Sequence, residues 1–210
     1  MIPFISRWLD PTLMSRSDAA RWAAARTFGD LCELTAQWIE GTISSQPGYS
    51  GPSDIEDPAM VPVLAALNRA GFLTSGSQAG CKGDGWEQRA AAEGFIAGTA
   101  AAYGLADAAW KAGMTVVMHS PDTLPTRRYR CGGAVTVTRS GGGDYTEFGV
   151  QVPRRHIRSR ITGYGICRRS AVRELCEAWQ VAVIDPEWGR VGLLWNVLAA
   201  ALRPGTGWLA

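Results

Sequence analysis

DPAMVPVLAALNRAGFLTSGSQAGCKGDGWEQRAAAEGFIAG, residues 57–98, is the stretch that decides the fold. Asp57 suits the N-cap of a helix and Pro58 suits its first position. Apolar residues then repeat at helical spacing, and Gly71 ends the helix. An extended run begins at Phe72. The stretch therefore predicts a buried helix that leads directly into a strand.

Small and hydrogen-bonding residues, Ser-Gly-Ser-Gln-Ala-Gly, follow at positions 75–80. Because such residues let a ligand approach the backbone closely, we interpret them as a binding loop, with an ordinary flexible connection as the alternative. Trp86 lies close to this loop, Gln88 can hydrogen-bond a base edge, and Arg89 can pair with an anion. The candidate ligand-binding residues in this part of the chain are Ser75, Ser77, Gln78, Trp86, Gln88 and Arg89.

Three pieces of the chain resemble a known family. They are GYSGP at residues 48–52, LNRAGFLTSGSQAG at residues 67–80 and WEQRAAAEGF at residues 86–95. The resemblance is to an uncharacterised family of actinobacterial proteins classed as a domain of unknown function, and it covers roughly residues 30–202. It implies one intact domain in an actinobacterial setting, and it implies no activity, cofactor or catalytic residue.

Charge is segregated along the chain, although its overall sum is only +2. Residues 1–120 carry a net charge of −4, residues 121–173 carry +8 and residues 174–210 carry −2. The middle zone, from Arg127 to Arg173, holds eleven arginines and no lysine, and the guanidinium group suits bidentate contact with phosphate or carboxylate. We interpret the zone as an anion-binding surface, and a merely solvated face is the alternative. Its candidate ligand-binding residues are Arg130, Arg154 and Arg155.

Several catalytic and cofactor sites are excluded by residue type and spacing. The chain has only two histidines, His119 and His156, and it lacks the P-loop, dinucleotide-binding and nucleophile-elbow motifs. Five cysteines without a C-x-x-C pair predict free thiols and no metal centre. His119 ends a predicted strand and is the candidate general acid or base, with Ser77 and Glu87 as catalytic partners. The cofactor, if any, is unknown from the sequence.

Helical and extended segments mix without a strict βαβ rhythm, which predicts an α+β fold with a mixed, partly antiparallel sheet and helices packed on it. Residues 134–138 and 145–152 predict a hairpin, because a serine, three glycines and an aspartate separate them. Residues 99–112 predict a helix with Tyr103 and Trp110 facing inward. We expect a single α+β domain over residues 30–210, preceded by an N-terminal arm and short helix over residues 1–29.

Composition predicts a protein with a sizeable core, since 46% of its 210 residues are hydrophobic. The first residues, MIPFISRWLDPT, lack the features of a secretory signal. The apolar run at residues 191–202 is shorter than the roughly 20 residues that span a bilayer. We therefore expect a cytoplasmic protein without membrane contact.

Three functions remain open on the sequence alone. The leading hypothesis is a cytoplasmic binding protein for a small anionic, nucleotide-like ligand, held between residues 75–80 and the arginines of residues 127–160. The second is an enzyme that uses His119 as general acid or base near Ser77 and Glu87. The third is a nucleic-acid or protein-interaction module that uses the arginine zone alone.

Overall fold

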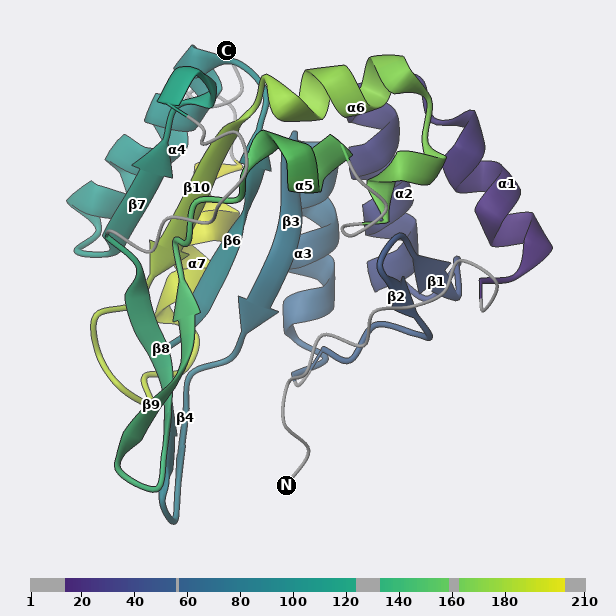
Figure 1. The fold of residues 1–210 in the computed structure, drawn as a ribbon. Helices are drawn as coiled ribbons and strands as arrows, with labels where there is room; N and C mark the ends of the chain where they lie inside the picture. The colour runs from purple at the N-terminus through teal and green to yellow at the C-terminus, as the bar shows by residue number, and fades with distance from the viewer. Residues whose placement is uncertain (1–13, 56, 124–132, 159–162, 203–210) are drawn as a thin grey trace.

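A four-stranded antiparallel sheet lies at the centre of the protein (Figure 1). This computed structural model describes residues 14–55, 57–123, 133–158 and 163–202. The strand order of the central sheet is β3-β6-β10-β7, so strands distant in the sequence pair with one another. The bounds are β3 (Phe72–Gln78), β6 (Ala91–Ile96), β10 (Trp179–Ile184) and β7 (Thr115–His119).

Helices cover one face of this sheet with the largest apolar core. They are α3 (Met60–Arg69), α4 (Thr99–Lys111) and α7 (Leu193–Ala201). Phe72, Ile96 and Val183 of the sheet pack against Leu64, Leu105 and Leu198 of these helices, all of them buried. Gly71 follows α3 with φ +95, a left-handed conformation that favours glycine and ends the helix as expected.

The other face of the central sheet is covered at one end by a second group of helices. They are α1 (Arg16–Ala24), α2 (Phe28–Ile39), α5 (Arg154–Arg158) and α6 (Arg169–Cys176), with the short helix η4 (Tyr164–Ile166) beside them. Helix α2 also packs along α3, and its Ala36, Trp38 and Ile39 belong to the first core. A second core forms there, in which Trp22, Leu31 and Leu175 pack near Leu73 and Phe95 of the sheet. Figure 1 shows α5 and α6 side by side at the end of the molecule opposite the hairpin of the second sheet.

A second four-stranded antiparallel sheet has the order β4-β5-β8-β9. Its strands are β4 (Cys81–Gly83), β5 (Trp86–Gln88), β8 (Val135–Ser140) and β9 (Gly143–Phe148). The predicted hairpin is confirmed, because β8 and β9 pair through a turn in which Gly141 and Gly142 both have positive φ. A small sheet of β1 (Ser45–Gln46) and β2 (Tyr49–Ser50), and the short helix η2 (Pro121–Thr123), complete the described part.

The α+β prediction is confirmed, with helices packed on antiparallel sheets in one domain. The predicted helix over residues 99–112 forms as α4, but its inward face is wrong. Ala102, Leu105 and Ala109 are buried, whereas Tyr103 and Trp110 are 56% and 71% exposed. The two buried alanines let α4 approach the sheet closely, and its large aromatic rings are left outside. None of the helices in the described ranges is both long and apolar enough to cross a membrane.

The interpretation of residues 75–80 as a loop is also wrong. Residues up to Gln78 belong to β3, which pairs with β6 through a bulge at Ser75. A Cβ on Gly76 would lie 3.2 Å from the Phe148 ring, and one on Gly80 would lie 2.1 Å from the carbonyl oxygen of Arg190. These small residues therefore allow neighbouring segments to pack closely.

Candidate functional sites

One face of the central sheet carries polar side chains beside its second core. Strand register places Gln180 of β10 between Phe95 of β6 and His119 of β7. In the next row, Glu93 of β6 stands opposite Ala182 of β10. Directly paired residues point to the same side of a sheet, and so do residues two apart on one strand. Glu93, Gln180 and His119 therefore share one face.

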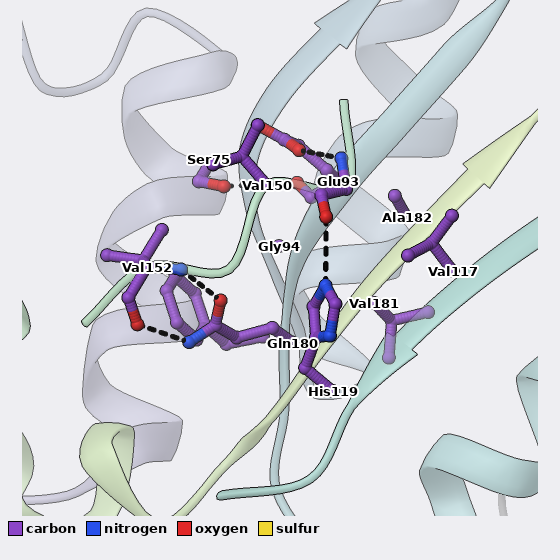
Figure 2. A pocket seen from close by; sticks show the side chains of 12 residues that line it. Ser75, Glu93, Gly94, Val117, His119, Val150, Val152, Gln180, Val181 and Ala182 are labelled. Carbon is purple, nitrogen blue, oxygen red and sulfur yellow. Dashed lines mark hydrogen bonds between the residues drawn. The ribbon is translucent and has the colours of Figure 1, made fainter. Parts of the chain in front are cut away.

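These three side chains hold the segment of residues 149–152, which crosses the sheet between β9 and α5 (Figure 2). The Gly149 N–H donates to Oε2 of Glu93 at 3.0 Å, and the Gly149 carbonyl accepts from Nε2 of His119 at 2.8 Å. The Gln180 amide accepts from the Val152 N–H at 2.8 Å and donates to the Val152 carbonyl at 2.9 Å. Side chains thus give this segment the hydrogen bonds that a paired strand would supply.

A small pocket opens between this segment and the sheet (Figure 2). The volume inside it that the centre of a water-sized molecule can occupy is only about 20 Å³. Ser75, Glu93 and His119 form its polar side, and Val117, Val150 and Val152 form its apolar side. The Ser75 hydroxyl is exposed and donates to the Glu93 backbone carbonyl at 3.3 Å. This volume is far below the range typical of ligand sites and is enough for about one water molecule.

Glu93 has an unusual electrostatic environment in this pocket. Burial raises the pKa of the Glu93 carboxyl to about 7, although the hydrogen bond from the Gly149 N–H favours the ionised form. His119 is held in the tautomer with a proton on Nε2, because the Gly149 carbonyl can only accept a hydrogen bond. A carboxyl group that titrates near neutrality inside a pocket is a recognised mark of a functional residue.

The amide side chains predicted to bind ligand are structural. Nε2 of Gln78 is buried and donates to the backbone carbonyls of Arg89 and Val137, and its Oε1 accepts from the Thr138 hydroxyl. Oε1 of Gln88, which is also buried, accepts a hydrogen bond from the Cys81 thiol. Gln78 joins the two sheets and Gln88 joins β5 to β4.

Trp86 belongs to β5 of the second sheet, Arg89 directly follows that strand, and neither lines the pocket. The Trp86 ring contacts Tyr145 edge-on, with centroids 5.5 Å apart. The Arg89 guanidinium lies 4.3 Å from the centre of the Trp188 ring, and Arg139 lies 4.5 Å from the same ring. Burial, reinforced by the nearby Arg139 charge, lowers the pKa of Arg89.

The structure does not bring the three predicted catalytic residues together at the pocket. His119 lines the pocket, but Ser77 and Glu87 do not. Oε1 of Glu87 lies 3.9 Å from Nζ of Lys82, on the second sheet. Glu93 is the polar group that the sequence reasoning missed. A signal for it was present, because it is the one charged residue in the otherwise apolar strand AAEGFI.

A second candidate site is the arginine surface of α5 and α6. We use "α5–α6 arginine surface" for Arg155, Arg158, Arg168, Arg169 and Arg173, all of which are exposed. None of them forms an ion pair with a carboxylate in the described ranges of the chain. Arg154 is half-buried beside them and donates to the Pro121 carbonyl at 2.8 Å. Arg127, Arg128, Arg130 and Arg160 lie outside the described residues.

The chain matches a described protein family over most of its length. The family described as a domain of unknown function, DUF6919, matches residues 17–204. The chain belongs to this family. No curated protein matches the chain. The description of the DUF6919 family names no activity.

Proposed function

We propose that the protein binds the phosphate backbone of a nucleic acid through the α5–α6 arginine surface. The observation that carries this proposal is that five exposed arginines on two adjacent helices have no carboxylate partner in the described part of the chain. Several exposed cations elsewhere are paired, such as Arg69 with Glu33 and Glu40 and Lys111 with Asp107. Arg16, Arg21 and Arg26, in and beside α1, are exposed without an ion pair in the described ranges. Guanidinium groups without a carboxylate partner are available for bidentate contact with phosphate oxygens.

The start of α6 supports this proposal, because it is not optimised for helix stability. Arg168 is the N-cap residue and makes no capping hydrogen bond through its side chain, and Arg169 occupies the first turn. Cations are unfavourable at the positive end of a helix dipole, where Ser or Asp would stabilise the helix. Residues that reduce stability are expected where they serve a function.

The neighbouring side chains favour contact with the backbone of a duplex over binding of a single strand. Proteins that hold single strands stack bases on exposed aromatic rings. Tyr164 is the only aromatic residue in the described parts of the region from α5 to α6, and it is buried at 8% exposure. Without a stacking platform, the arginines support sequence-independent binding of phosphates.

The small nucleotide-like ligand that the sequence suggested has less support than a polyanion. Its expected loop is strand β3, and no arginine lines the pocket beside that strand. We also propose a cytoplasmic location, supported by the thiols at positions 32, 81, 167 and 176, which form no disulfide. An actinobacterial origin rests on the resemblance alone.

The direct test is binding of a fluorescently labelled DNA duplex at low salt. The wild type is expected to bind, and Arg169→Ala/Arg173→Ala is expected to bind at least about tenfold more weakly, because two phosphate contacts are lost. Lys82→Ala/Lys111→Ala is the matched control, since it removes two exposed cations on other elements. Equal weakening by both pairs would contradict the proposal. Binding of polyglutamate but not DNA would show an acidic protein partner instead.

A further inference from the structure

Strand β7 is an unprotected edge of the central sheet. It stands at the end of the order β3-β6-β10-β7, and in the described ranges of the chain it pairs with β10 alone. Its sequence, TVVMH, contains no lysine, proline or carboxylate, and it pairs with β10 in continuous register. All of its residues are only partly buried. Proteins normally protect such an edge with a charge, a proline or a bulge, because its free N–H and C=O groups can pair with another strand.

The other edges of the two four-stranded sheets have these protections. Strand β3, at the opposite edge of the central sheet, has the bulge at Ser75. In the second sheet, β4 is only 3 residues long and carries Lys82, and β9 carries Asp144 and Glu147. Among these four edge strands, β7 therefore differs in having neither a bulge nor a lysine or carboxylate.

Helix α4 exposes two aromatic rings beside this edge. It packs over β10 and β7 and also contacts α7, which in turn contacts α3, so α4 is the outermost helix of its layer at the β7 side (Figure 1). One flank of α4, with Ala101 and Ala108, packs against the first core that α7 shares. Tyr103 and Trp110 lie on the opposite flank at helical spacing, and they are 56% and 71% exposed.

We propose that two copies of the chain pair through β7 and form a symmetric dimer in which the two central sheets become one. A two-fold axis through Val117, perpendicular to the sheet, makes the two β7 strands antiparallel. Val116 then stands opposite Met118 of the partner subunit, and Thr115 stands opposite His119 of the partner subunit. The paired strands contain no lysine or carboxylate, so like charges do not oppose this register.

The same axis brings the two α4 helices together. A rotation about an axis perpendicular to the sheet leaves both helices on the same face of the joined sheet. Each α4 lies over β10 and β7, so the two helix axes are separated by about two strand spacings, or roughly 10 Å. Packed helices are about 8–10 Å apart. Each α4 therefore covers the exposed flank of the other, including Tyr103 and Trp110.

The area that this contact buries is in the range of a stable dimer. An aromatic side chain offers roughly 200 Å² for burial, so the exposed parts of Tyr103 and Trp110 contribute roughly 250 Å² in each copy. The four rings thus provide about half of the roughly 1,000 Å² that a specific interface needs. The partly buried residues of the two β7 strands add to this area. The dimer involves no residue of the α5–α6 arginine surface, so this proposal is independent of duplex binding.

Sedimentation equilibrium of the full chain without nucleic acid tests the dimer. At concentrations up to about 100 μM, where micromolar affinities are detected, the wild type is expected to reach twice the 22.5 kDa mass of one chain. Trp110→Lys is expected to raise the dissociation constant at least about tenfold, because it removes two rings from the interface and adds two cations to it. Tyr145→Lys, which replaces an exposed aromatic residue of the second sheet, is the matched control and should leave the dissociation constant unchanged.

Cross-linking tests the strand pairing itself. In Val117→Cys the two new thiols face each other across the axis, and directly opposed residues of antiparallel strands are close enough for a disulfide. Mild oxidation with copper phenanthroline is expected to give a covalent dimer in Val117→Cys, and no more of it in Tyr145→Cys than in the wild type. A wild type that stays monomeric, equal weakening by Trp110→Lys and Tyr145→Lys, or no cross-link in Val117→Cys above the wild-type background would overturn the proposal.

Discussion

Two polar residues on one face of the central sheet, Glu93 and Gln180, show how single side chains hold the crossing segment of residues 149–152. Both hold the crossing segment by accepting from a backbone N–H. Gln180 does so without any titratable group. Glu93 carries a carboxyl group whose pKa burial raises to about 7, and the fold gains nothing from that charge. The two residues therefore make equivalent backbone contacts at different electrostatic cost.

Replacing Glu93 with glutamine should make the protein more stable in mildly alkaline buffer. The folded-state pKa of about 7 exceeds the ordinary value of 4.5, so the folded protein binds more protons than the unfolded chain between these pH values. Stability is therefore lost as the pH rises through this window, by up to about 3 kcal/mol. Denaturant unfolding at pH 5 and pH 8 should show this loss in the wild type and not in Glu93→Gln. A larger loss in the variant would contradict the assigned environment.

Glycine 80 is a second position where one residue decides how two segments pack. An added Cβ would lie 2.1 Å from the carbonyl oxygen of Arg190, which is backbone and cannot move aside cheaply. Gly80→Ala should lower the free energy of unfolding by on the order of 2 kcal/mol or more. Gly83→Ala, with nothing within 4 Å, should change it by less than about 0.5 kcal/mol. Chemical denaturation of both variants measures the difference, and equal stability would contradict the close packing.

At the scale of single elements, most strands and helices could be predicted, but some faces and ends could not. The glycine-rich hairpin of β8 and β9 and the helix α3 follow from local turn and spacing signals. The serine-glycine stretch at residues 75–80 was misread, because its glycines leave room for the Phe148 ring and the Arg190 backbone, which are distant in the sequence. The exposed aromatics of α4 were misread for a similar reason, since only the approach of the helix to the sheet decides its inner face.

Helix α6 offers a prediction at the same scale. Arg168 at its N-cap makes no capping hydrogen bond through its side chain. Arg168→Asp should raise the free energy of unfolding by about 1 kcal/mol, because the carboxylate caps the first turn and complements the dipole. The same variant should bind duplex DNA more weakly than the wild type. Thermal unfolding and fluorescence anisotropy test the two effects, and a variant that is less stable or binds more tightly would contradict this account.

At the scale of the whole molecule, the α+β class followed from the mixture of elements, but the candidate sites depended on long-range pairing. The sequence order hides the juxtaposition of β6, β7 and β10, so His119 was recognised and Glu93 was not. The arginine zone was visible as composition, and the structure adds that its α5–α6 part is exposed and unpaired within the described ranges. Charges without an ion-pair partner in the described ranges thus mark the proposed phosphate-binding surface.

The salt dependence of duplex binding tests the central claim most directly. If the five arginines of the α5–α6 arginine surface each contact a phosphate, the logarithm of the association constant should fall with the logarithm of salt concentration with a slope of roughly −4.5. In Arg169→Ala/Arg173→Ala the slope should become about two units shallower, whereas Lys82→Ala/Lys111→Ala should keep the wild-type slope. A slope that is the same in all three proteins, or a wild type that does not bind duplex at low salt, would contradict the account.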